Sequence, residues 1–107
     1  MATVSSGYVN QQQIATEVEQ AIAKLGPEVV HIKYTVEDDM SGEPAIYFRI
    51  TLTDEACSTD KALDEVAERV SNSLFDELRP YSNWGLRAYF HFRSYSEQAA
   101  LKDPAWV

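Results

Sequence analysis

The order of apolar and polar positions along the chain predicts two long amphipathic helices and three strands. Apolar residues recur at helical spacing over residues 11–25 and 60–78, and they alternate with polar residues over 29–37, 46–53 and 86–93. A capping-box pair, Ser94 and Glu97, predicts a last short helix that ends near Lys102. The predicted order is therefore helix, strand, strand, helix, strand, short helix.

Residues that cap or stop helices define where these elements end. Asn10 has the position and residue type of a helix N-cap, and Gly26, followed by a proline, ends the first helix. Pro80 ends the second long helix. Residues 1–9 are short and rich in Ser, Thr and Gly, so we expect a flexible arm followed by a single domain over residues 10–107.

The pattern predicts a small α+β domain. Each long helix has one apolar stripe and each strand has one apolar face, so both helices should pack on one face of a three-stranded, mainly antiparallel sheet and leave the other face open. The crossover through residues 60–78 should make the third strand run parallel to the second. Two strand orders remain possible: 2-1-3, which is fully antiparallel, and 1-2-3, which is mixed.

Alternation along the three strands gathers basic and aromatic side chains on the open face. The chain as a whole is acidic, with a formal net charge of -8, so a locally basic and aromatic surface is the expected site of a partner. We call this surface the basic–aromatic face. Its predicted centre comprises Tyr47, Arg49, Arg87, Tyr89 and His91. Lys33 and Arg93 lie at its margins, and His31 lies on the same side.

The same surface has two further interpretations. Tyr, Thr and Arg are ordinary residues of a solvated sheet face, where they pair across strands. A second copy of the chain could also complete the sheet, either through an edge strand or face to face. Trp106 is expected to pack at the edge of the core.

Composition narrows the class of protein. A sequence pI near 4.6 disfavours nonspecific nucleic-acid binding, which requires an excess of Lys and Arg. No apolar run approaches the ~20 residues that cross a bilayer, and the N-terminus has no secretory signal pattern. The single cysteine excludes an internal disulfide bond. We therefore expect a cytoplasmic protein without membrane association.

Two candidate chemical sites are weaker. Cys57 lies just before the second long helix, where a thiol can become acidic, but Asp54 and Asp60 nearby disfavour the thiolate. His31 and His91 could meet across adjacent strands, but the neighbouring Lys and Arg side chains would repel a metal ion. We expect no catalytic residues, no metal and no cofactor.

Residues 51–57 and 103–106 resemble the small iron–sulfur-assembly domain family, which shares the order helix, strand, strand, helix, strand. Ser58 follows the cysteine where that family has proline, and residues 26–28 read Gly-Pro-Glu instead of Asp-Pro-Glu. The order is also similar to that of KH-like RNA-binding domains, but the Gly-x-x-Gly loop that clamps RNA there is absent from this sequence. No function is carried over from either family.

The sequence favours a small noncatalytic protein-binding or regulatory module that uses the basic–aromatic face. Such modules include inhibitors, antitoxin-like and immunity-like proteins, and accessory subunits. The first alternative is nucleic-acid binding, with bases stacked on the same face. The second is a small enzyme that uses Cys57 or the pair His31 and His91.

Overall fold

The computed structural model describes residues 11–107; the predicted arm, 1–9, and the Asn10 cap lie outside the described residues. The helices are α2 (Gln11–Ile22), α3 (Asp60–Leu78), α4 (Pro80–Trp84) and α5 (Tyr95–Leu101). The strands are β1 (Val29–Asp38), β2 (Pro44–Leu52) and β3 (Arg87–Ser94), and two single 3-10 turns are η1 (Glu55–Cys57) and η2 (Pro104–Trp106). This order confirms the predicted α+β class.

The sheet has the order β1-β2-β3, which is the mixed alternative. β1 and β2 form an antiparallel hairpin, and β2 pairs in parallel with β3, as the crossover through α3 predicts. The fully antiparallel order 2-1-3 does not form. β2 is the most buried strand, which suits the central position, whereas β1 is half-buried along its middle and exposed toward both ends.

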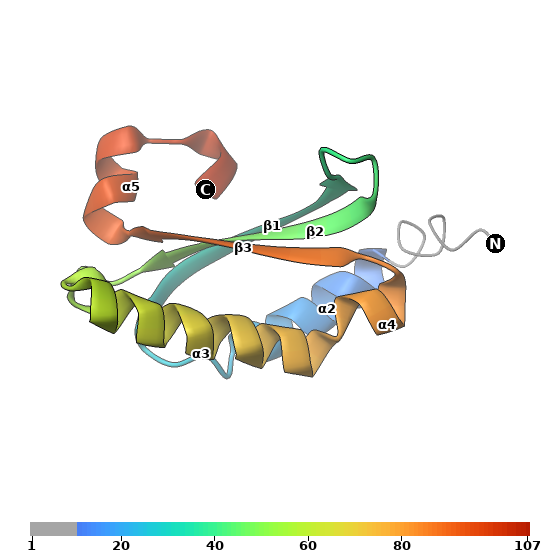
Figure 1. Ribbon diagram of the computed structural model, residues 1–107, viewed down its shortest axis with the longest axis horizontal. Helices are drawn as coiled ribbons and strands as arrows, with labels where there is room; N and C mark the ends of the chain where they lie inside the picture. The colour runs from blue at the N-terminus through green and yellow to red at the C-terminus, as the bar shows by residue number, and fades with distance from the viewer. Residues whose placement is uncertain (1–10) are drawn as a thin grey trace.

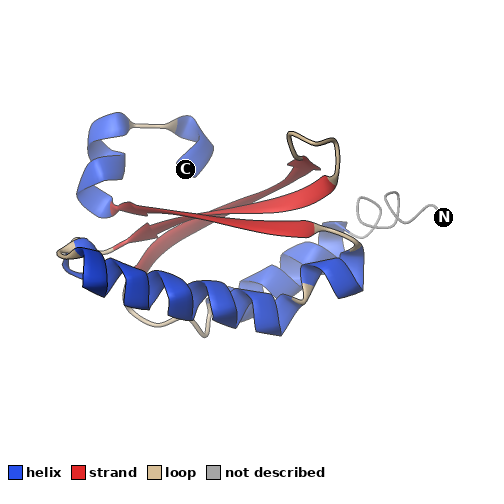
Figure 2. Cartoon of the chain, in the orientation of Figure 1, coloured by secondary structure: helices blue, strands red, loops and turns tan. Residues whose placement is uncertain are grey.

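The helices α2, α3 and α4 lie on one side of the sheet and enclose the core (Figures 1 and 2). Phe48 lies at the centre of β2 with no exposed surface, and its ring stacks on that of Phe90 with a centroid distance of 5.4 Å. Val18 of α2 and Leu74 of α3 are fully buried in the same cluster. Among the described helices, none combines the length and apolar character that crossing a membrane requires.

The chain between α3 and β3, where the sequence pattern predicts neither helix nor strand, contains the short helix α4. Arg79 adopts a left-handed conformation (φ 42°) that ends α3, and Pro80 starts α4 at the position where a helix tolerates proline. Trp84, at the end of α4, is only 5% exposed because it packs into the core. α4 therefore leads the chain from the end of α3 to the start of β3.

Residues 95–107, which we call the C-terminal segment, fold back over the sheet face opposite α2 and α3 (Figure 1). α5 begins at the predicted cap, because the Ser94 hydroxyl accepts a hydrogen bond from the Glu97 main-chain N–H (3.1 Å). The segment ends in η2, whose Trp106 is 6% exposed. The face that the alternation pattern predicts to be open is therefore covered at one end by the chain itself.

Candidate functional site

The strand register arranges the basic–aromatic face in rows that cross the three strands. Each row takes one residue from β1, one from β2 and one from β3. Listed from the hairpin loop toward the C-terminal segment, the rows are Glu37, Ala45 and Arg87; Thr35, Tyr47 and Tyr89; Lys33, Arg49 and His91; and His31, Thr51 and Arg93.

Three rings form a stacked series in the middle of this face. The Tyr47 and Tyr89 rings lie 5.0 Å apart with an interplanar angle of 18°, and Tyr47 and His91 lie 6.2 Å apart at 14°. The Arg49 guanidinium carbon lies 5.5 Å from the centre of the Tyr47 ring, within cation–π range. This arrangement places three aromatic rings next to one another beside a positive charge.

Hydrogen bonds hold the charged neighbours of these rings in place. Arg49 Nη1 donates to the hydroxyl of Thr35 (3.1 Å), and that hydroxyl donates to a carboxylate oxygen of Glu37 (2.9 Å). Arg87 is exposed, and its positive charge acts on Tyr89 to lower the pKa of the hydroxyl, partly offsetting the effect of Asp39. Arg49 and Arg87 therefore flank the ring series from two sides.

Asp39, in the loop between β1 and β2, is a site residue that the sequence reasoning missed. One of its carboxylate oxygens accepts from the main-chain N–H (2.9 Å) and hydroxyl (2.7 Å) of Ser41 and from the N–H of Glu43 (3.0 Å). The other accepts from the Tyr89 hydroxyl (2.7 Å). An Asp followed two residues later by Ser is typical of an Asx turn, and that signal could have identified it.

These contacts change two pKa values. The hydrogen bonds from Ser41 and Tyr89 hold the pKa of Asp39 far below its ordinary value, because they stabilise the carboxylate. The same bond raises the pKa of the Tyr89 hydroxyl, which is stabilised in its neutral form. At neutral pH the loop is therefore fixed to the ring series by a charged acceptor and a neutral phenol.

A hollow of about 370 Å³ lies where the loop meets the rings. It is lined by Asp39, Met40, Ser41, Tyr47, Tyr89 and His91. The Met40 side chain at its rim is fully exposed (104% relative exposure). An exposed methionine beside aromatic rings is an adaptable apolar contact surface.

The other end of the face is occupied by the C-terminal segment. Arg93 pairs with Asp103 (3.2 Å), donates to the Gln98 side chain (2.9 Å) and lies 4.4 Å from the Trp106 ring centre. Lys33 Nζ donates to the main-chain oxygen of Val107 (2.9 Å). The expectation that Lys33 and Arg93 lie at the margins of an open face is therefore corrected, because both side chains hold the C-terminal segment in place.

The remaining five predicted residues lie on what we call the uncovered end of the face: Tyr47, Arg49, Arg87, Tyr89 and His91. His31 lies near the covered end, where it lines a separate hollow with Trp106. His31 on β1 and His91 on β3 are in different rows with β2 between the two strands, so the sheet does not bring these imidazoles together. Over residues 11–107, no group of three potential metal-ligating side chains is present.

Cys57 lies in η1, half-buried against the core. Burial raises the pKa of its thiol, and the negative charges of Asp54 and Glu97 raise it further. The thiol form is therefore favoured, which is opposite to what an activated nucleophile needs.

Comparison with known proteins finds no family model, no curated protein and no solved structure that matches this chain.

Proposed function

We propose that this protein is a small noncatalytic binding module whose partner is another protein, held at the uncovered end of the basic–aromatic face. The observation that carries the proposal is the stacked series Tyr47, Tyr89 and His91, which stands beside Arg49 and a hollow. Tyr and Arg are the side chains that most often dominate the binding energy of protein interfaces.

The geometry suits a partner that presents an apolar side chain next to a carboxylate. The apolar group would enter the hollow between Met40 and the tyrosine rings, where it would be removed from water. The carboxylate would meet the guanidinium of Arg49, which its contacts with Thr35 and Tyr47 already orient. An already oriented site loses little side-chain entropy when it binds.

A regulatory role, as an inhibitor, an antitoxin-like or immunity-like protein, or an accessory subunit, fits a site that binds without chemistry. The raised pKa of Cys57 supports this assignment over a thiol-based enzyme. We place the protein in the cytoplasm, where a lone half-buried thiol stays reduced.

Nucleic-acid binding is the second candidate, because stacked rings also accept bases. It is disfavoured by charge. Lys33 and Arg93 are engaged by the C-terminal segment, which leaves Arg49 and Arg87 to face the phosphates on a molecule of net charge -8.

The test compares partner binding by the wild type with that of Tyr47→Ala/Arg49→Ala. A matched control is Lys61→Ala/Tyr81→Ala, which removes one basic side chain and one tyrosine from exposed sites on α3 and α4. The partner is captured from the source cell after nuclease treatment, purified, and titrated by calorimetry. We expect the face variant to weaken binding about 30-fold or more, as the loss of about 2 kcal/mol implies. Equal binding by all three proteins would reject the proposal.

A further inference from the structure

The outer edge of β1 is available for strand pairing in the described sheet. β1 and β3 are the two edge strands, and β1 is ten residues long without a proline. In the hairpin, the Asp39 N–H donates to the Glu43 oxygen (2.8 Å), so the positions that bond toward β2 are the odd residues of β1. The main-chain groups of Tyr34 and Val36 therefore face the free edge.

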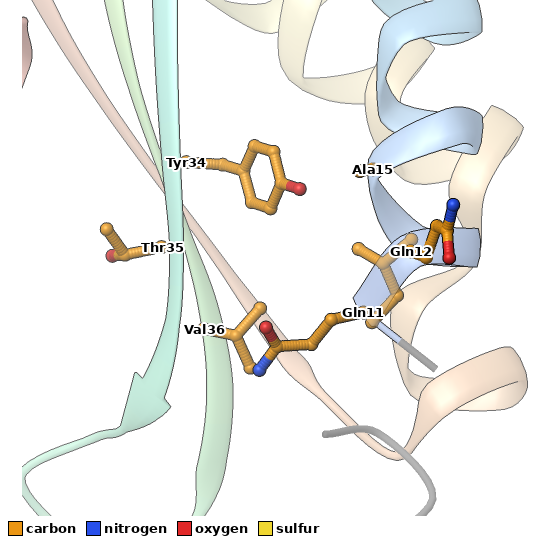
Figure 3. Close-up of a pocket in the computed structure, with 7 residues that line it drawn as sticks. Gln11, Gln12, Ala15, Tyr34, Thr35 and Val36 are labelled. Carbon is orange, nitrogen blue, oxygen red and sulfur yellow. The ribbon is translucent and has the colours of Figure 1, made fainter. Parts of the chain in front are cut away.

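A groove of about 510 Å³ runs along this edge, between β1 and the first turns of α2 (Figure 3). Figure 3 shows the Tyr34 ring directed toward α2, and Val36 beside the side chain of Gln11. On a molecule of net charge -8, this groove has no charged residue in its lining, which comprises Gln11, Gln12, Ile14, Ala15, Tyr34, Thr35 and Val36. An uncharged groove is the surface on which two acidic molecules can meet with least repulsion.

We propose that a second copy of this chain binds here, with β1 pairing antiparallel to β1 of the copy about a two-fold axis at Thr35. In this register Lys33 stands opposite Glu37 of the second copy, and the symmetry makes the same pair twice. Tyr34 stands opposite Val36, and their outward main-chain groups exchange hydrogen bonds. The axis at Thr35 also coincides with the middle of the β1 side of the groove, so charge pattern and shape select the same centre.

The existing contacts of the two charged residues are compatible with this pairing. The ammonium group of Lys33 has three donors, of which one is directed to the Val107 oxygen. The Glu37 carboxylate, which accepts from Thr35, has the capacity to accept further bonds. Both residues lie on the same face of β1.

The other edge strand lacks this complementarity. The basic side chains of β3 are Arg87, His91 and Arg93, and this strand contains no Asp or Glu. Antiparallel self-pairing of β3 would therefore place like charges near each other without any opposite charge to compensate. Charge alone selects β1 as the self-pairing edge.

A third observation agrees with the register. Met40 and Val30 are both exposed apolar residues, with relative exposures of 104% and 46%. With the two-fold axis at Thr35, each residue lies opposite the one whose number makes a sum of 70. Met40 of the second copy therefore lies opposite Val30. Dimerisation would therefore bring Met40 of one copy toward Val30 of the other, at the rim of the hollow that Met40 lines.

Charge reversal in the full-length chain tests the pairing. We expect the wild type to be a dimer by sedimentation equilibrium at micromolar concentration. Lys33→Glu and Glu37→Lys should each weaken the dimer about tenfold or more, because each change turns two attractive pairs into two repulsive ones. The double variant Lys33→Glu/Glu37→Lys should restore it. The control Lys61→Glu/Glu65→Lys, at exposed positions with the same spacing on α3, should not change it.

A second test uses cysteine cross-linking to locate the two-fold axis at Thr35. Opposite residues at such a non-hydrogen-bonded position have Cα atoms about 4.5 Å apart, which suits a disulfide bond. Thr35→Cys in a Cys57→Ser background should therefore form a disulfide-linked dimer on oxidation with diamide. Lys33→Cys in the same background should not, since four strand positions separate it from its equivalent, about 13 Å.

A monomeric wild type would overturn the proposal. A dimer that neither charge reversal weakens, or that Lys33→Cys links as readily as Thr35→Cys, would also overturn it, because the copies would then meet elsewhere or in another register. A second prediction of the pairing, rescue by the double variant, remains measurable even if one single variant folds poorly.

Discussion

Asp39 shows how one side chain can connect a loop to a binding surface. Its two oxygens join the turn at Ser41 and Glu43 to the hydroxyl of Tyr89 on β3. The carboxylate thus connects the loop and the Tyr89 ring, which both line the hollow. Loss of this carboxylate should affect the titration of the ring as well as the stability of the fold.

We predict that Asp39→Ala lowers the pKa of Tyr89, because the substitution removes the acceptor and the negative charge that favour the neutral phenol. NMR titration of the tyrosine ring signals, assigned with Tyr89→Phe, measures this shift. Tyr34, whose pKa is raised mainly by burial, is the internal control and should not move. An unchanged Tyr89 titration would contradict the hydrogen bond.

The same residue gives stability a defined pH dependence. The folded pKa of Asp39 is depressed below its ordinary value of 3.8, so its contribution is present above about pH 4 and lost as the pH falls through the folded value. The difference in free energy of unfolding between wild type and Asp39→Ala should therefore be constant near neutral pH and shrink in acid. Urea titrations at a series of pH values test this.

At the scale of elements, the strands and the start of α5 were predictable, but the docking of the C-terminal segment on the sheet was not. Alternation predicts which residues share a sheet face because side chains of a strand point to opposite faces in turn, whatever the strand packs on. The covering of that face depends on contacts between distant residues, such as Arg93 with Trp106 and Lys33 with Val107. No periodicity within residues 95–107 encodes them.

Strand order and the helix α4 also depend on more than local sequence patterns. The crossover direction followed from chain connectivity, but whether β3 would lie beside β1 or β2 depended on how completely each strand buries both faces. α4 depends on the left-handed conformation of Arg79, which residue type does not favour. Asp39 was missed because turn chemistry, and not strand periodicity, brings it to Tyr89.

We predict that Trp106→Ala detaches the C-terminal segment from the sheet. Trp106 is 6% exposed and lines a hollow together with Thr51, which is 3% exposed, so the change removes a large apolar side chain next to the sheet. We expect a loss of about 3 kcal/mol in the free energy of unfolding, measured by urea denaturation. Val107→Ala, at an exposed side chain whose main-chain oxygen is the bonded group, should change stability little.

At the scale of the whole molecule, the distribution of charge separates the two candidate partners. A net charge of -8 surrounds a face on which the cations of the uncovered end are Arg49, Arg87 and, when protonated, His91. Few side chains on this surface can pair with phosphates, and the negative charge of the rest of the molecule repels a polyanion.

We therefore predict that fluorescence anisotropy detects no binding of single-stranded DNA or RNA oligonucleotides at physiological salt. Tight binding, with an affinity that falls steeply as salt rises and is lost in Arg49→Ala/Arg87→Ala, would instead favour the nucleic-acid alternative. The wild type in low salt is the most sensitive condition for this comparison.

The mixed sheet also determines when its parts can assemble. β1 and β2 are joined by a short loop, whereas α3 and α4 separate β2 from β3 along the chain. Closing the longer loop costs more chain entropy, so the hairpin is expected to form early and β3 to dock late. Substitutions in the hairpin should then slow folding, and those at Trp106 should chiefly accelerate unfolding. The lifetime of the native state would thus depend most on the C-terminal segment, which docks last.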